Sequence, residues 1–378
     1  MRDRQGRRPA AASSAARRLL ALAAAALAGC AGGPAPQPER SPERIQADIQ
    51  ALMPPRVPQA AGWATDLQLV FAALRIDASP AKVCAVLAVT EQESGFQVDP
   101  PVPNLSKVAR AEIERRADNA GVPKLALDLA LQLRSPDGRS YGERLDAVKT
   151  EGELSRMYEQ FIDQVPLGRR LFGRFNPVRT AGPMQVGIAF AEQQVQARPY
   201  PFPAQDTVRH EVFTRRGGLY FGTVHLLDYA APAYGGEMIY RFADFNAGRH
   251  ASRNAAFQQA LGVASGRTLD LDGDLIAGAA SEPDQTEAAA RSLGAALGLS
   301  DEQIRRQLQH GDRADFDDSE LLRGVYALAE RRSGKPQPRV RLPRIELHSP
   351  KITRRLTTEW FARRVNDRYL RCLARQAG

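Results

Sequence analysis

The stretch Thr90-Glu91-Gln92-Glu93-Ser94-Gly95-Phe96 ends an apolar segment and places two carboxylates where the chain turns polar. Upstream, Ser79-Pro80 supplies an N-cap residue and a proline that the first helical position tolerates. The sequence therefore predicts a helix from about residue 80 to residue 93. Three residues of this helix share the face of Glu93, at spacings of three, four and seven: Thr90, Val89 and Val86.

Glu93 is the candidate acid of this helix. A carboxyl held against apolar side chains has its charged form disfavoured, so we expect its pKa to rise toward neutrality. An acid that cleaves glycosidic bonds needs this property, because it must carry a proton near pH 7. Glu91 lies two residues away on another face, which predicts a solvated or salt-bridged surface group. The simpler alternative is that Glu93 only ends the helix, although the helix dipole disfavours acids there.

Residues 1–29 have the pattern of a signal peptide, with six arginines before and around an apolar stretch. That stretch, Leu19 to Leu27, is too short to span a bilayer. It leads into Leu27-Ala28-Gly29-Cys30, which resembles the bacterial lipobox and implies that Cys30 carries the lipid. Ala31 is compatible with a lipid-anchored protein at the periplasmic face of the outer membrane. The alternative is an ordinary secretory signal that contains a cysteine.

The charge balance indicates no nucleic-acid partner. Of the 52 basic and 43 acidic residues, residues 1–29 hold six and one, which leaves a net charge of +4 for the rest. Such a mild charge lacks the basic patch of a nucleic-acid-binding protein.

Helical periodicity dominates after a Pro/Gly-rich tether at residues 30–41, and the fold class is predicted to be mainly α. Ser41-Pro42 is expected to start the first helix of the body. Cys84 and Cys372 could form a disulfide between the helix of Glu93 and the C-terminal helix. The alternative is a buried thiol and a stray one, and spacing alone does not decide between them.

Two more motifs follow, Ala181-Gly182-Pro183-Met184-Gln185-Val186 and Phe245-Asn246-Ala247-Gly248. With the Glu93-Ser94 pair, and in this order, they resemble the three motifs of the soluble lytic transglycosylases, relatives of goose-type lysozyme. The resemblance implies a lysozyme-like helical catalytic domain from residues 42–100 and 177–260. It leaves residues 101–176 as a helical insertion that could bind a protein partner, and residues 261–378 as a C-terminal helical extension.

The resemblance also implies a function and a site. Glu93 would be the single catalytic acid and base that cleaves peptidoglycan between N-acetylmuramic acid and N-acetylglucosamine, leaving 1,6-anhydromuramoyl ends. Two departures stand out: Pro183 replaces a leucine, and Phe245 replaces a tyrosine whose hydroxyl reaches toward the catalytic region. The implied substrate-binding residues are Ser94, Gly182, Met184, Gln185, Val186, Phe245 and Asn246.

Two other functions remain open from the sequence. One is a non-catalytic lipoprotein that keeps the fold as a peptidoglycan-binding or scaffolding module. The other is hydrolysis with water, which needs a second carboxylate, Asp99 or Asp244. No cofactor is expected, and no metal, because the five histidines have no ligand spacing and the aspartates of residues 270–274 do not match an EF-hand register.

Overall fold

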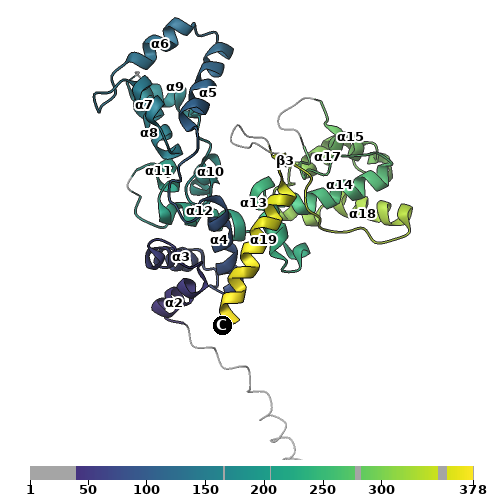
Figure 1. The fold of residues 1–378 in the computed structure, drawn as a ribbon. Helices are drawn as coiled ribbons and strands as arrows, with labels where there is room; N and C mark the ends of the chain where they lie inside the picture. Colours follow the sequence, from purple (N-terminus) through teal and green to yellow (C-terminus); the bar gives the residue numbers. More distant parts are fainter. Residues whose placement is uncertain (1–39, 165–166, 205, 277–281, 348–355, 378) are drawn as a thin grey trace, which may run out of the picture. The chain divides into compact units, whose positions relative to one another are not determined.

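The computed structural model describes residues 40–164, 167–204, 206–276, 282–347 and 356–377 (Figure 1). The predicted signal peptide, Cys30 with its predicted lipid, and nearly all of the predicted tether lie outside the described residues. The chain divides into two units, residues 1–42 and residues 43–378. The described part is mainly α-helical, as predicted. None of its helices is both long and apolar enough to cross a membrane.

The helices follow the capping signals of the sequence. Pro80 begins the helix of Glu93, and Thr150 with Glu153 forms a capping box at the start of α8. The first helices are α2 (Pro42–Leu52), α3 (Ala60–Leu74) and α4 (Pro80–Glu93). Residues 101–176 form α5 (Leu105–Asn119), α6 (Lys124–Gln132), α7 (Tyr141–Ala147), α8 (Glu151–Asp163), α9 (Gly168–Phe172) and the 3₁₀ helix η1 (Gly173–Phe175).

The remaining described elements are helices, with one short hairpin before them and another before the last long helix. After η1 come β1 (Thr180–Ala181), β2 (Val186–Gly187), α10 (Ile188–Ala197), α11 (Val208–Val212), α12 (Arg215–Leu227), η2 (Pro232–Tyr234) and α13 (Met238–Ala247). The last part holds α14 (Ala251–Ser265), α15 (Gln285–Arg291), α16 (Gly294–Leu297), α17 (Asp301–Leu308), η3 (Ala314–Asp318), α18 (Glu320–Ser333), β3 (Glu346–Leu347), β4 (Leu356–Thr357), α19 (Thr358–Ala374) and η4 (Arg375–Ala377). β1 pairs with β2, and β3 with β4, both antiparallel.

Four helices, α4, α12, α13 and α19, form a closed ring of contacts. α4 packs against α12 and α19, α12 packs against α13, and α13 packs against α19 (Figure 1). Every residue of α4 from Val83 to Thr90 is buried. Burial on all sides explains why α4 is almost uniformly apolar rather than amphipathic. The first hydrophobic cluster, which runs from Ile49 to Cys372, is built on this ring.

A second hydrophobic cluster is formed by α14 to α18, from Phe257 to Ala329. α18 packs along α14, and α15 joins α14 to α17. The C-terminal helix α19 belongs instead to the first cluster, through Phe361, Ala362 and Val365. The predicted extension, residues 261–378, thus contributes its last helix to the core that was assigned to residues 42–100 and 177–260.

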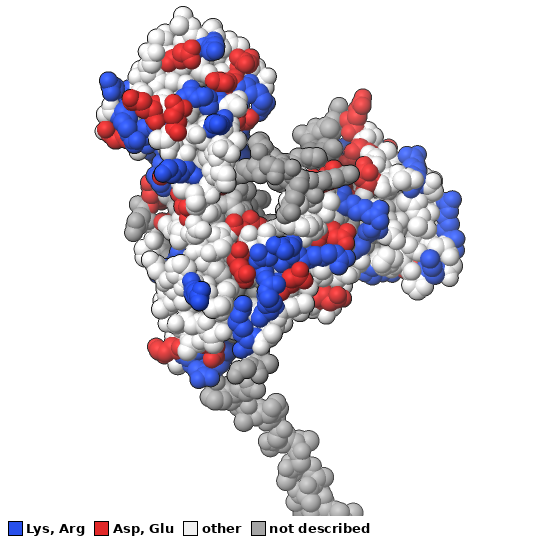
Figure 2. All heavy atoms as spheres, viewed as in Figure 1, with Lys and Arg blue, Asp and Glu red and all other residues white. Residues whose placement is uncertain are grey.

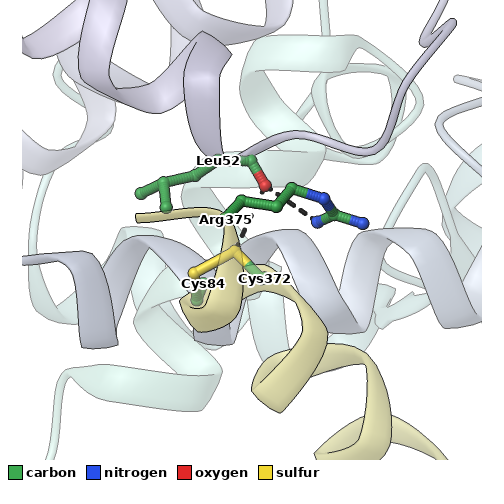
Figure 3. Close-up of a disulfide and its surroundings, with 4 residues drawn as sticks. All are labelled: Leu52, Cys84, Cys372 and Arg375. Atoms are coloured by element: carbon green, nitrogen blue, oxygen red, sulfur yellow. Dashed lines mark hydrogen bonds between the residues drawn. A yellow bond between two sulfur atoms is a disulfide. The ribbon is translucent and has the colours of Figure 1, made fainter. Parts of the chain in front are cut away.

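A disulfide joins α4 to α19, the possibility that the sequence left open. Cys84 and Cys372 are bridged, with their Cα atoms 5.5 Å apart (Figure 3). The Cys372 sulfur also contacts the carbonyl oxygen of Leu52 at 3.3 Å. Arg375 donates a hydrogen bond of 3.0 Å to the same oxygen (Figure 3). The end of α2 is thereby fixed beside the bridge.

Candidate active site

Glu93 is the last residue of α4 and is partly exposed. Loss of contact with water raises the pKa of the Glu93 carboxyl from 4.5 to about 7. Among the described residues, its carboxylate has neither a hydrogen-bond partner nor an ion-pair partner. A carboxyl that solvent can reach, that is disfavoured as an anion and that has no partner can donate its proton to a ligand.

Glu91 faces α19, as expected for a salt-bridged group. Its carboxylate lies 3.5 Å from Arg368 and 3.9 Å from Arg371. These arginines are part of the basic side chains that gather along α19, with acidic side chains between them (Figure 2). Two residues along a helix differ by about 200° in direction, so Glu93 points away from these cations. Their charge therefore does not lower its pKa.

The backbone after Glu93 is strained, and this strain has a structural support. Gly95 and Phe96 have φ values of 58° and 64°, in the left-handed region that few aromatic residues occupy. The Phe96 ring is buried and packs edge-on against Trp63, with centroids 5.5 Å apart. Ser94 is buried and its hydroxyl donates to the Thr90 carbonyl at 3.0 Å. Ser94 and Phe96 thus fix the turn that ends α4.

The second motif forms the β1–β2 hairpin. Gly182 has a φ of 74°, and a Cβ there would lie 2.0 Å from the Val212 carbonyl oxygen, so only glycine fits. Met184 is fully buried, and a Cβ on Gly222 of α12 would clash with its sulfur at 2.3 Å. Val186 is buried as well. Met184 and Val186 therefore shape the hairpin from inside rather than presenting a surface.

Gln185 is the member of this motif that reaches the surface. It has a φ of 50°, which is uncommon for a residue with a side chain. Its Oε1 accepts from the Thr180 hydroxyl at 3.1 Å, and its Nε2 donates to the Gly182 carbonyl at 3.3 Å. The amide thus stabilises its own hairpin, with one N–H left for another acceptor.

The third motif ends α13. Asn246 is exposed and its Oδ1 accepts from the Thr358 hydroxyl at 2.8 Å, which ties α13 to the start of α19. Phe245 is partly exposed, and its ring packs against His225 with centroids 5.0 Å apart. The Phe245 carbonyl lies 3.2 Å from His225 Nε2. Phe245 is therefore held against α12 by both its ring and its backbone.

α12 is the element that connects the three motifs, because α4, β2 and α13 all pack against it. Two of its contacts involve residues that the sequence did not indicate. His225 is half-buried, and this burial, with the nearby charge of Arg249, lowers its pKa to about 4, so it is neutral at pH 7. Arg249 donates to the Val224 carbonyl at 2.6 Å. Nothing in the local sequence around His225 or Arg249 indicates that they contact the residues of the motifs or α12.

The two carboxylates considered for hydrolysis have structural partners. Asp244 is buried and accepts from Tyr229, Tyr234 and the backbone N–H groups of His250 and Ser252. Asp99 accepts from the Thr150 hydroxyl at 2.7 Å and from the Gly152 N–H at 3.1 Å, which caps α8. Each carboxylate accepts hydrogen bonds at the start of a helix, so neither is free to act opposite Glu93.

The described residues contain no group of three or more histidine, cysteine, aspartate or glutamate side chains arranged to hold a metal ion. The aspartates near residue 272 bind protein instead: Asp272 accepts from Gln258 at 2.8 Å and from the Asp274 N–H at 3.0 Å. This segment is a polar turn fixed to α14.

Comparison with known proteins gives a family. Residues 56–375 match the family described as protein of unknown function, DUF1615. The chain belongs to this family. It is 52% identical over 358 residues to the "Uncharacterized protein YaiW" of Escherichia coli (strain K12), covering 94% of this chain and 97% of that protein. No solved structure matches the chain. The DUF1615 match extends from before α3 into η4, so all three motifs lie within it.

Proposed function

We propose that this DUF1615 protein is a lipid-anchored peptidoglycan lytic transglycosylase in which Glu93 is the catalytic acid and base. The observation that carries the proposal is the state of Glu93: a partly exposed carboxyl whose pKa burial raises to about 7. Near neutral pH such a group exists in both forms, and the reaction uses both in turn.

The chemistry needs one carboxyl group. Glu93 gives its proton to the oxygen that links N-acetylmuramic acid to N-acetylglucosamine, and the bond from that oxygen to the muramoyl C1 breaks. The muramoyl C6 hydroxyl then bonds to C1, and the Glu93 carboxylate takes the hydroxyl proton. The products are a shortened glycan and a 1,6-anhydromuramoyl end, with no water consumed.

The fate of the other carboxylates supports a single-acid reaction over hydrolysis. Hydrolysis by two carboxyls requires one of them to hold a water or to attack the sugar. Asp244 and Asp99, the two candidates for that role, each accept several hydrogen bonds from helix starts. A carboxylate used in this way is a poor base for water.

The first two motifs support the proposal through backbone shape. Each places residues in the left-handed region, Gly95 and Phe96 after Glu93, and Gly182 and Gln185 in the hairpin. Such backbone strain gathers at functional sites because the surrounding packing must hold it. Lipid attachment at Cys30 completes the proposal, since it keeps the protein beside the cell wall.

The test is mass spectrometry of peptidoglycan incubated with the purified full chain, beside Glu93→Gln. Anhydro-muropeptides from the wild type and none from the variant are expected. Glu91→Gln is the matched control, because it removes a carboxylate from the same helix and keeps Glu93. Reducing ends in place of anhydro ends would mean hydrolysis. Binding of glycan without any product, by both proteins, would overturn the enzyme and favour a peptidoglycan-binding module.

A further inference from the structure

A cavity of about 620 Å³ lies where the insertion meets β2, α10 and α11. It contains none of the motif residues. Its polar lining includes four arginines and two glutamates. Its apolar lining comes mainly from Ile162, Val178 and Ile188. The polar side chains that line it are Glu159, Arg169, Arg174, Asn176, Arg179, Glu192, Thr207 and Arg209.

Half of these charges are already satisfied within the protein. Arg169 donates two hydrogen bonds to Asp163, at 2.5 and 2.7 Å. Glu159 lies 3.6 Å from Arg209 and 2.6 Å from the His210 Nε2. The Arg209 guanidinium donates to the Val178 carbonyl at 3.1 Å. Arg169, Glu159 and Arg209 therefore build the pocket and are not its free charges.

Three charged side chains of the lining have no ion-pair partner in the described part of the chain: Arg174, Arg179 and Glu192. All three are exposed. Arg179 also lies close enough to Arg209 for their like charges to repel, which, after burial, helps to lower the pKa of Arg209. Glu159 and Glu192 act on Arg209 in the opposite direction and favour its charge. The four arginines of the lining outnumber its two glutamates, which leaves a net positive pocket.

Two aromatic side chains outside the pocket lining flank one of its arginines, Arg174. Phe172 and Phe175, on either side of Gly173 and Arg174, are 41% and 45% exposed. The Arg174 guanidinium lies 4.7 Å from the centre of the Phe175 ring, which preorganises it. Exposed aromatics next to arginines are typical of binding sites rather than of solvent-facing surface.

We propose that this pocket binds a zwitterionic peptide, with a peptide carboxylate held by Arg174 and Arg179 and an ammonium group facing Glu192. A guanidinium binds a carboxylate through two parallel hydrogen bonds. The two glutamates of the lining oppose a doubly charged phosphate more than a singly charged carboxylate. The peptide can be a stem attached to cell-wall glycan or a free peptide. The binding does not depend on the reaction proposed for Glu93.

The test is isothermal titration of the full chain with the tripeptide alanyl-glutamyl-diaminopimelate, which carries both carboxylates and ammonium groups. We expect Arg174→Gln with Arg179→Gln to weaken binding at least tenfold, and amidation of the peptide carboxylates to do the same. Arg156→Gln on α8 is the matched control, because Arg156 is exposed and does not line the pocket. Within the part of the chain that the structure describes, neither Arg174 nor Arg179 has an ion pair to lose, so the double variant should keep its circular dichroism.

A further titration identifies the source of the peptide, and two outcomes would contradict the proposal. Glycan that retains its peptide stems, titrated beside glycan stripped of them, separates an attached stem from a free peptide. Unchanged peptide affinity in the double variant would overturn the proposal, and so would binding of inorganic phosphate but not of the peptide. Because the tripeptide has no glycosidic bond, a negative result here leaves the Glu93 reaction untouched, and an inactive Glu93 leaves this binding untouched.

Discussion

The ends of α4 and α13 each carry a carboxylate at the point where a helix stops, and the two carboxylates differ in their partners. Asp244 accepts hydrogen bonds from two tyrosine hydroxyls and two backbone N–H groups. Glu93 has no such donor among the described residues. Burial raises the pKa of both. For Asp244, however, every hydrogen bond opposes the effect of burial.

The difference separates a carboxylate that stabilises the fold from one that is available for chemistry. The donors around Asp244 form the start of α14, so its charge has a structural use. When Glu93 is ionised it lowers the stability of the folded protein, because no donor among the described residues stabilises its charge. A group held in an unfavourable state needs a function to explain it.

The largest expected effect is on the reaction rate. Glu93→Gln should lower the rate of anhydro-muropeptide release by about 10²–10⁴-fold, the usual contribution of a general acid. Asp244→Asn should leave the rate per folded molecule within about tenfold. Initial rates, normalised to the folded fraction from circular dichroism, measure both. An equal loss of rate in the two variants would contradict the assignment of a catalytic role to Glu93 and a structural role to Asp244.

The next effect is on stability, and it concerns Asp244. Asp244→Asn places an amide against N–H and O–H donors, and we expect it to cost about 3 kcal/mol of unfolding free energy. Urea unfolding measures this cost. Glu91→Gln is the comparison, because its partly exposed ion pairs at 3.5 and 3.9 Å should contribute less than about 1 kcal/mol. A smaller loss for Asp244→Asn than for Glu91→Gln would contradict the structural role of Asp244.

Glu93→Gln should change the free energy of unfolding in the opposite direction and stabilise the protein at high pH. The pKa of Glu93 is about 7 in the folded chain and 4.5 for an unperturbed glutamate, so the folded state binds its proton more tightly. Its stabilising effect is complete below pH 4.5 and is lost as the pH rises to 7. At pH 8 the variant should therefore exceed the wild type in stability, by up to about 3 kcal/mol. Thermal unfolding at pH 4 and pH 8 checks this, and a variant that is less stable at pH 8 would mean that Glu93 has a partner.

The smallest effect is on the pH profile. Because the first step of the proposed reaction needs protonated Glu93, kcat/KM should fall about tenfold per pH unit above pH 7. Initial rates between pH 6 and pH 9 measure it. A rate that is flat across this range would show that another group supplies the proton.

Local signals in the sequence predicted the helix of Glu93 well. Ser79-Pro80 placed its start and the polar turn placed its end, and α4 runs from Pro80 to Glu93. The expected rise in the pKa of Glu93 and the ion pairing of Glu91 also agree with the structure. The bounds of the helix and the face that each glutamate occupies depend on neighbouring residues and on helical periodicity. The partners of Glu91, Arg368 and Arg371, lie far along the chain, and the sequence predicted only that such a surface group would be solvated or paired.

Features that depend on distant residues could not be read in this way. The sequence left the Cys84–Cys372 bridge open, because its two cysteines are 288 residues apart. It gave Asp244 as a possible catalytic group, because the donors that occupy it come from η2, the end of α12 and the start of α14. It also missed the arginine pocket, whose lining residues are scattered between Glu159 and Arg209 with no helical or strand periodicity that would mark them as one site.

The bridge between α4 and α19 has a consequence for the order in which the site is made. α4 emerges early in synthesis, but two neighbours of its ring, α13 and α19, follow it by more than a hundred residues. Until Cys372 is available, α4 exposes the face that α19 later covers, and the bridge beside the end of α2 is missing. A chain that lacks its last helix thus leaves one side of the helix of Glu93 open. The ring of helices closes only when the C-terminal residues have been made and the two cysteines have been oxidised.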